Sequence, residues 1–98
     1  MFKFKASDAK FYLFGDIKSC DWTVYVADSA ENLIDYLTKN QYLDFAQELI
    51  ASLKQQNYKL LSSNTNFLME DGEEIELSDL IFPDNEGYIQ IGEIIADF

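Results

Sequence analysis

Residues 10–27 read KFYLFGDIKSCDWTVYVA, and this stretch decides the fold. Its first part places aromatic residues on both faces of an extended segment, until Gly15 and the polar run after it break the pattern. The following WTVYVA is rich in the β-branched and aromatic residues that strands favour. The preceding FKFK, residues 2–5, alternates as a half-buried strand does. We therefore predict an antiparallel hairpin of residues 10–16 and 22–27, with a loop of about five residues.

A helix is predicted after the hairpin. Asp28 or Ser29 can cap its start, and the spacing from Asp28 to Glu31 fits a capping-box variant. Its apolar face would consist of Ala30, Leu33, Ile34 and Leu37. The helix is predicted to end near Lys39 and Asn40.

A second helix is predicted to begin at about Gln41 and to close at Asn57. Its apolar stripe has helical spacing and consists of Tyr42, Phe45, Ala46, Leu49, Ile50 and Leu53. Two helices joined by so short a turn form an αα-hairpin.

The remainder of the chain alternates strand and turn signals. Residues 58–63 (YKLLSS) and 67–70 (FLME) are predicted strands, and Gly72 in the turn DGEE can supply a positive φ. Residues 74–82 (EIELSDLIF) fit a strand or a helical turn. Residues 88–95 (YIQIGEII) are predicted to be the last strand. The fold class is therefore α+β, a mostly antiparallel sheet with two helices packed on one face.

The composition fits one domain, residues 1–98. Eight Phe, six Tyr and one Trp supply its core. The charged start MFKFKASDAK lacks the apolar run of a signal peptide, and no stretch of about 18 apolar residues could span a membrane. A lone cysteine, Cys20, allows no internal disulfide, and Asp16 and Asp21 disfavour a reactive thiolate there despite Lys18. A cytoplasmic protein is expected.

The charge is distributed unevenly along the chain. Residues 1–59 hold all seven lysines and eight acids, whereas residues 60–98 hold ten acids and no cation. The net charge is −11, without any Arg or His. Phosphate binding needs clusters of Lys and Arg, so direct binding to nucleic acid or to an anionic membrane is not expected. A basic protein partner or a cation is favoured instead.

Most catalytic and metal-binding groups are absent from the sequence. Without His there is no Ser–His or Cys–His nucleophile, and one Cys cannot build a zinc site. Neither GxGxxG nor GxxxxGK occurs, and without Arg there is no bidentate anion clamp. We therefore expect no enzyme, no catalytic residues and no cofactor.

Residues 82–93, FPDNEGYIQIGE, partly resemble an EF-hand calcium loop. The positions that match are Asp84, Glu86, Gly87, Ile89 and Glu93. Phe82, however, stands where the motif has its first Asp. The same residues also fit a hairpin turn between LIF and YIQI. Pro83 has a fixed φ that suits a turn, and Gly87 can take a positive φ. We favour the hairpin and keep a degenerate calcium module as a minor alternative.

The acidic C-terminal third supplies the candidate partner-binding residues. They are Glu70, Asp71, Glu73, Glu74, Glu76, Asp79, Asp84, Glu86 and Tyr88. On a strand, Glu74 and Glu76 would point the same way about 6.6 Å apart, close to two steps of the roughly 3.4 Å phosphate spacing of DNA. If the last strands pair as predicted, these residues form one negative surface that suits a cationic groove.

In size, charge and lack of catalytic residues, the chain resembles small acidic inhibitors encoded by phages and mobile elements: anti-CRISPR proteins, other nucleic-acid mimics and nuclease-toxin immunity proteins. The resemblance implies an inhibitor that blocks the nucleic-acid groove of a basic, nucleic-acid-handling partner. Two alternatives are an immunity protein for a nuclease toxin, and a structural or adaptor domain whose acidity serves solubility. An edge strand could also pair two copies into a homodimer.

Overall fold

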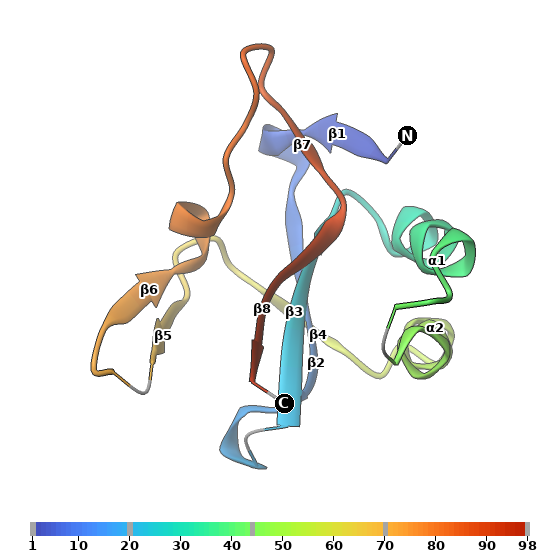
Figure 1. Ribbon diagram of the computed structural model, residues 1–98, viewed down its shortest axis with the longest axis horizontal. Helices are drawn as coiled ribbons and strands as arrows, with labels where there is room; N and C mark the ends of the chain where they lie inside the picture. The colour runs from blue at the N-terminus through green and yellow to red at the C-terminus, as the bar shows by residue number, and fades with distance from the viewer. Residues whose placement is uncertain (1, 20, 44, 70, 98) are drawn as a thin grey trace.

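A central hairpin organises the four-stranded sheet of the computed structural model (Figure 1). The structure describes residues 2–19, 21–43, 45–69 and 71–97. β2 (Lys10–Asp16) and β3 (Asp21–Ala27) pair antiparallel, as predicted. β4 (Lys59–Leu61) flanks β2, and β8 (Gly92–Asp97) flanks β3, both antiparallel. The strand order is therefore β4-β2-β3-β8.

Both faces of the central hairpin are buried. Residues 11–14 of β2 and 22–27 of β3 are buried without interruption. Because successive side chains of a strand point to opposite faces, such a run needs cover on both sides. The helices lie on one side of the sheet, and a second, smaller hairpin lies on the other (Figure 1).

The first helix, α1 (Ala30–Lys39), begins where the sequence predicts it. Ser29 is its N-cap, and the Ser29 Oγ accepts a 3.1 Å hydrogen bond from the backbone N–H of Asn32. Asp28, the other candidate cap, instead accepts hydrogen bonds from the side-chain amide of Asn32. The predicted apolar face is confirmed, with Leu33 and Leu37 fully buried and Ala30 and Ile34 partly buried.

The second helix, α2 (Ala46–Lys54), begins later than the predicted start near Gln41. Phe45 has left-handed backbone angles, with φ at 63°. A left-handed residue cannot continue a right-handed helix, so the predicted stripe holds only from Ala46 onward. The prediction was wrong for Tyr42 and Phe45, which are 81% and 53% exposed.

The end of α2 is a Schellman motif. Gln56 takes a left-handed conformation, and its N–H donates to the carbonyl oxygen of Leu53. The N–H of Asn57 donates to the carbonyl oxygen of Ser52 at 2.8 Å, which completes the motif. Asn57 therefore closes the helix as predicted, and α1 and α2 pack together as an αα-hairpin. Within the described parts of the chain, neither helix has the length and apolar character needed to cross a membrane.

A second hairpin covers the opposite face of the sheet. β5 (Asn66–Leu68) pairs antiparallel with β6 (Glu74–Glu76), and Gly72 between them has the predicted positive φ, 85°. The Phe67 ring stacks on the Trp22 ring with centroids 5.0 Å apart and planes 14° from parallel. This contact joins the small hairpin to the central one.

The segment 74–82, which fits either a strand or a helical turn by sequence, contains both. β6 comes first, and the 3-10 helix η3 (Leu77–Leu80) follows it directly. Leu77 is fully buried, so η3 adds to the core on the same side as the small hairpin.

The N-terminal strand pairs with a segment near the C-terminus. β1 (Lys3–Lys5) and β7 (Tyr88–Gln90) form a separate two-stranded antiparallel sheet. Buried Phe4 lies opposite buried Ile89 in this pair. The alternation of residues 2–5 therefore predicts the strand correctly, although it does not identify the partner.

Two predictions for the C-terminal strands were wrong. YIQ does not pair with LIF, because β7 takes β1 as its partner and buries Ile89 against Phe4. Residues 88–95 are not one strand either. The N–H of Ile91 donates to the carbonyl oxygen of Phe2 at 2.8 Å, and the chain then enters β8 in a different sheet.

Replacing Phe67 with Ala should remove the stack on Trp22 and leave a cavity between the two hairpins. Substitutions of this kind cost about 3–5 kcal/mol, so the free energy of unfolding should fall by that amount in urea denaturation. Leu68→Ala is a matched control, because Leu68 is 74% exposed. Surface changes stay within about 0.5 kcal/mol, so equal losses in the two variants would contradict the anchoring role of Phe67.

Tyr25 should make the protein sensitive to alkaline pH. Burial raises the pKa of Tyr25 to about 12, and Glu93 and Tyr36 act in the same direction. The folded state therefore holds the phenolic proton more tightly than the unfolded chain, in which the pKa is 10.0. This stabilisation is complete below pH 10 and is lost as the pH rises through about 12. Urea denaturation across this window should show a smaller loss of stability for Tyr25→Phe than for the natural chain.

Candidate functional site

The small hairpin continues beyond its two strands and forms an arm of residues 63–78. The N–H groups of Leu77 and Ser78 donate to the carbonyl oxygens of Thr65 and Ser63 at 3.0 and 2.9 Å. At the other end, the N–H of Met69 donates to the carbonyl oxygen of Glu73 at 2.8 Å. The arm projects to one side of the sheet in Figure 1. These bonds hold its strands in one register, so its side chains have defined positions.

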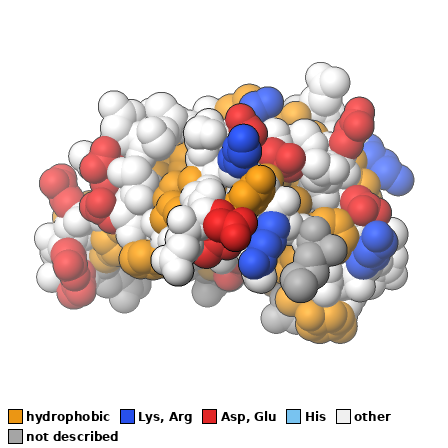
Figure 2. All heavy atoms as spheres, turned by 90° about the horizontal axis from the view of Figure 1, so that it is seen from above, with side chains coloured by type: hydrophobic (Ala, Val, Ile, Leu, Met, Phe, Trp, Pro, Cys, Tyr) orange, Lys and Arg blue, Asp and Glu red, His pale blue; other side chains and the backbone are white. Residues whose placement is uncertain are grey.

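Four of the candidate acids lie on this arm. Asp71, Glu73 and Glu74 are exposed, and Glu76 is half-buried. Asp71 Oδ1 accepts a 3.0 Å hydrogen bond from the N–H of Glu73, which orders the turn. Among the described residues, none of these four carboxylates forms an ion pair with a lysine. In Figure 2, the left end of the visible face, where Figure 1 places the arm, shows acidic side chains and no lysine.

The two faces of the arm differ in character. Phe67 and Ile75 lie opposite each other, and Phe67 faces the core through Trp22. The alternate positions point away from the core, where Glu74 lies opposite Leu68. Leu68 is therefore an exposed apolar side chain beside a carboxylate, which sequence reasoning missed. The exposure of Leu68 could have been predicted from its position next to Phe67 in a strand. Adjacent residues of a strand point to opposite faces, so one of the two must point outward.

The other candidate residues lie elsewhere. Asp79 is exposed on η3, next to the arm. Asp84 and Glu86 belong to the turn that leads into β7, and Tyr88 is the first residue of β7; this turn is at the top of Figure 1, away from the tip of the arm at the lower left. Their inclusion in one surface depended on the pairing of LIF with YIQI, which does not form. Glu70 falls outside the described residues, as does Cys20.

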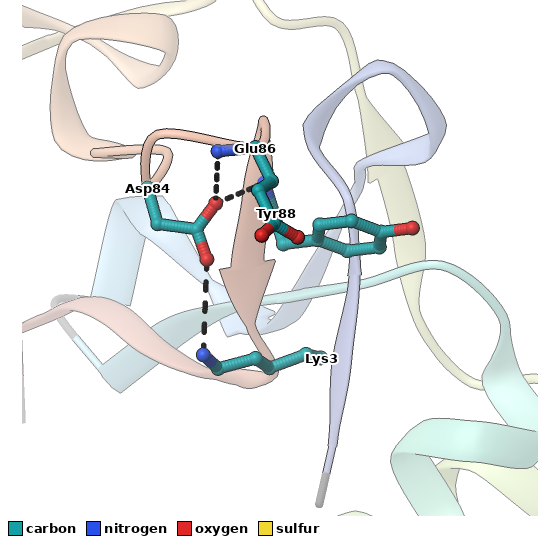
Figure 3. A network of polar contacts seen from close by, with 4 residues as sticks. All are labelled: Lys3, Asp84, Glu86 and Tyr88. Atoms are coloured by element: carbon teal, nitrogen blue, oxygen red, sulfur yellow. Dashed lines mark hydrogen bonds and ion pairs between the residues drawn. The ribbon is translucent and has the colours of Figure 1, made fainter.

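Asp84 orders its own turn. Its Oδ1 accepts hydrogen bonds of 2.9 Å from the N–H groups of Glu86 and Tyr88, and its Oδ2 lies 3.7 Å from the Lys3 Nζ (Figure 3). The hydrogen bond from Tyr88 is the main cause that lowers the pKa of Asp84, with Glu86 and Lys3 contributing. The ring of Tyr88 points away from this carboxylate and is half-buried.

The segment that resembles a calcium loop contains a hydrogen-bonded turn. The N–H of Gly87 donates to the carbonyl oxygen of Asp84, and Gly87 has a φ of 84°, as the turn chemistry predicts. Glu93 lies on β8, where its carboxylate accepts a 3.1 Å hydrogen bond from Thr23. Within the described parts of the chain, no three metal-ligating side chains come together in a way that could hold a metal ion. The residues of this segment therefore form a hydrogen-bonded turn followed by strands.

Comparison of the chain with protein-family models, with curated proteins and with solved structures finds no match.

Asp84 should titrate below the ordinary range of an aspartate. NMR titration of the side-chain carboxyl should give a pKa below 3.8, because backbone N–H groups and Lys3 favour the ionised form. A lowered pKa contributes stability above the unfolded value of 3.8, and that contribution is lost as the pH falls through the folded value. A measured pKa at or above 3.8 would show that the turn does not hold the carboxylate in solution.

Proposed function

We propose that the chain is a small non-enzymatic inhibitor that acts in the cytoplasm. It binds a basic, nucleic-acid-handling protein and blocks the groove that takes nucleic acid, in the manner of phage-encoded anti-CRISPR proteins. The observation that carries this proposal is the arm, whose carboxylates have no lysine partner among the described residues. Asp71, Glu73 and Glu74 are the primary contacts, with Glu76 and Asp79 at the edge.

The geometry of the arm supports occupation of a groove. A two-stranded ribbon has strands about 4.8 Å apart, so it is narrower than a nucleic-acid duplex. Glu74 and Glu76 are two residues apart on β6 and project on the same side, about 6.6 Å from each other along the strand. That spacing is close to two phosphate steps along one strand of DNA.

The charge distribution supports a basic partner. Residues 60–98 carry ten acids and no cation, and this segment includes the whole arm. A surface of one sign accelerates association with a surface of the opposite sign and makes binding sensitive to salt. The same charge disfavours binding to nucleic acid itself.

Charge reversal on the arm tests the proposal. Glu73, Glu74 and Glu76 are replaced together by Lys, and the variant is used as bait in an affinity capture from host lysate, beside the natural chain. The natural chain should retain a basic nucleic-acid-binding protein that is released by salt, and the variant should not. The fold should persist, because Glu73 and Glu74 are exposed, Glu76 is only partly buried, and surface charges contribute about 0–1 kcal/mol each.

A matched control separates the arm from net charge. Asp8, Glu31 and Asp35 are exposed acids outside the arm, so their joint replacement by Lys changes the net charge by the same amount. This control variant should still capture the partner. An added nucleic-acid duplex should compete with the control variant for the partner and reduce the capture. Retention by the arm variant, or equal loss in both variants, would show that the arm is not the contact surface.

A further inference from the structure

A small apolar pocket lies between the end of the central hairpin and α2. Its lining includes Phe14, Asp21, Phe45, Glu48, Leu49 and Ser52, and its volume is about 200 Å³. The helices and the arm lie on opposite sides of the sheet (Figure 1), so this pocket is separate from the acidic arm.

Three apolar side chains and a glycine form part of the pocket lining. Phe14 and Leu49 are buried, and the third apolar wall is Phe45, at the start of α2. Gly15 also lines the pocket, with φ at 89°. A Cβ at Gly15 would clash with the carbonyl oxygen of Asp21, so this position of the lining requires a glycine.

Two carboxylates complement the apolar walls. Asp21 and Glu48 are exposed, and neither forms an ion pair with a lysine among the described residues. The cavity is several times the roughly 30 Å³ share of one water, yet it is below the range of about 300–1,000 Å³ usual for small-molecule sites. Its size suits one long side chain, and its charge suits a cation.

We propose that this pocket receives an arginine side chain of a protein partner. An arginine has an apolar stem that can lie on Leu49 and Phe14. Its planar guanidinium can form hydrogen bonds with a carboxylate of Asp21 or Glu48, while Phe45 covers one wall of the pocket. Arginine is weakly hydrated for a cation, so it enters such a pocket at a lower desolvation cost than lysine.

A larger hollow beside the pocket gives the partner chain room. This hollow, of about 600 Å³, shares Gly15, Asp21 and Ser52 with the pocket and extends past Tyr58 to Lys59 of β4. The backbone that carries the arginine can therefore lie against the chain there. The proposal stands on the pocket alone and does not depend on the arm.

The test uses three small probes and NMR of the labelled natural chain. N-acetyl-arginine amide carries the stem and the charge, N-acetyl-citrulline amide carries the stem without the charge, and methylguanidinium carries the charge without the stem. The arginine probe should shift the amide signals of Gly15 and Ser52 with a dissociation constant on the order of 1 mM. The other two probes should bind there at least about tenfold more weakly, because each lacks one of the two complementary features.

The arm serves as an internal comparison. Its amides, such as those of Gly72 and Glu73, lie beside exposed carboxylates, so the arginine probe and methylguanidinium should affect them equally. Shifts at the arm without shifts at Gly15 and Ser52 would overturn the pocket proposal and leave the function of the arm intact.

Two variants, each with a control, complete the test. Glu48→Gln should weaken binding of the arginine probe at Gly15 and Ser52 several-fold, whereas Glu31→Gln on α1 should not. Phe45→Asn keeps a residue that tolerates the left-handed backbone and removes the ring, and Tyr42→Asn removes an exposed aromatic outside the pocket lining. Equal affinities for the arginine and citrulline probes, no shift at Gly15 and Ser52 up to roughly 10 mM, or an unchanged affinity in both Glu48→Gln and Phe45→Asn would overturn the proposal.

Discussion

Burial of β3 on both faces is the constraint on which the rest of the structure depends. Six consecutive residues, 22–27, are buried, and a strand presents its side chains alternately to two sides. One side is met by the helices, with Tyr25 close enough to Tyr36 of α1 for the two hydroxyl groups to interact electrostatically. The other side is met by the arm through Trp22 and Phe67. A three-layer arrangement follows from a single strand that cannot face water on either side.

The anchoring of the arm explains how the chain tolerates its charge. The carboxylates of the arm point away from the core, while Phe67 and the fully buried Leu77 of η3 hold the segment in place. Apolar burial of this kind does not weaken with salt, and exposed like charges cost little when water screens them. A strongly acidic segment can therefore be rigid, because the side chains that fix it are not the ones that carry its charge.

The sequence predicts the local features of this fold well and the distant pairings poorly. The central hairpin, the cap of α1 at Ser29 and the positive φ of Gly72 depend on neighbouring residues, and all are present. The pairing of β1 with β7 joins residues more than eighty positions apart, and no periodicity specifies it. The prediction of where α2 begins fails for a different reason. Phe45 is an apolar residue at helical spacing, but its backbone is left-handed.

The same distinction decides how much of the candidate site could be predicted. Asp71, Glu73, Glu74 and Glu76 share one surface because they belong to one hairpin, and the hairpin is encoded locally. Asp84 and Glu86 are separated from them because β7 turns to meet the N-terminal strand. Asp84 is also engaged by its own turn and by Lys3, whereas the arm carboxylates have no lysine partner among the described residues. The topology thus separates the acidic residues into two groups. Some carboxylates hold a turn in place, and others have no lysine partner among the described residues.

Charge and apolar contact act on different steps of binding, and the arm carries both. Carboxylates attract a basic partner before contact, so they govern mainly the association rate and its dependence on salt. Differences in affinity reside mostly in dissociation, which depends on contacts formed after water has been expelled. A single exposed leucine is ordinary on a protein surface, so the position of Leu68 matters more than its exposure. Leu68 lies opposite Glu74 on the outward face of the arm. A basic partner of the kind proposed, attracted by the carboxylates, would therefore meet an apolar side chain at the same place.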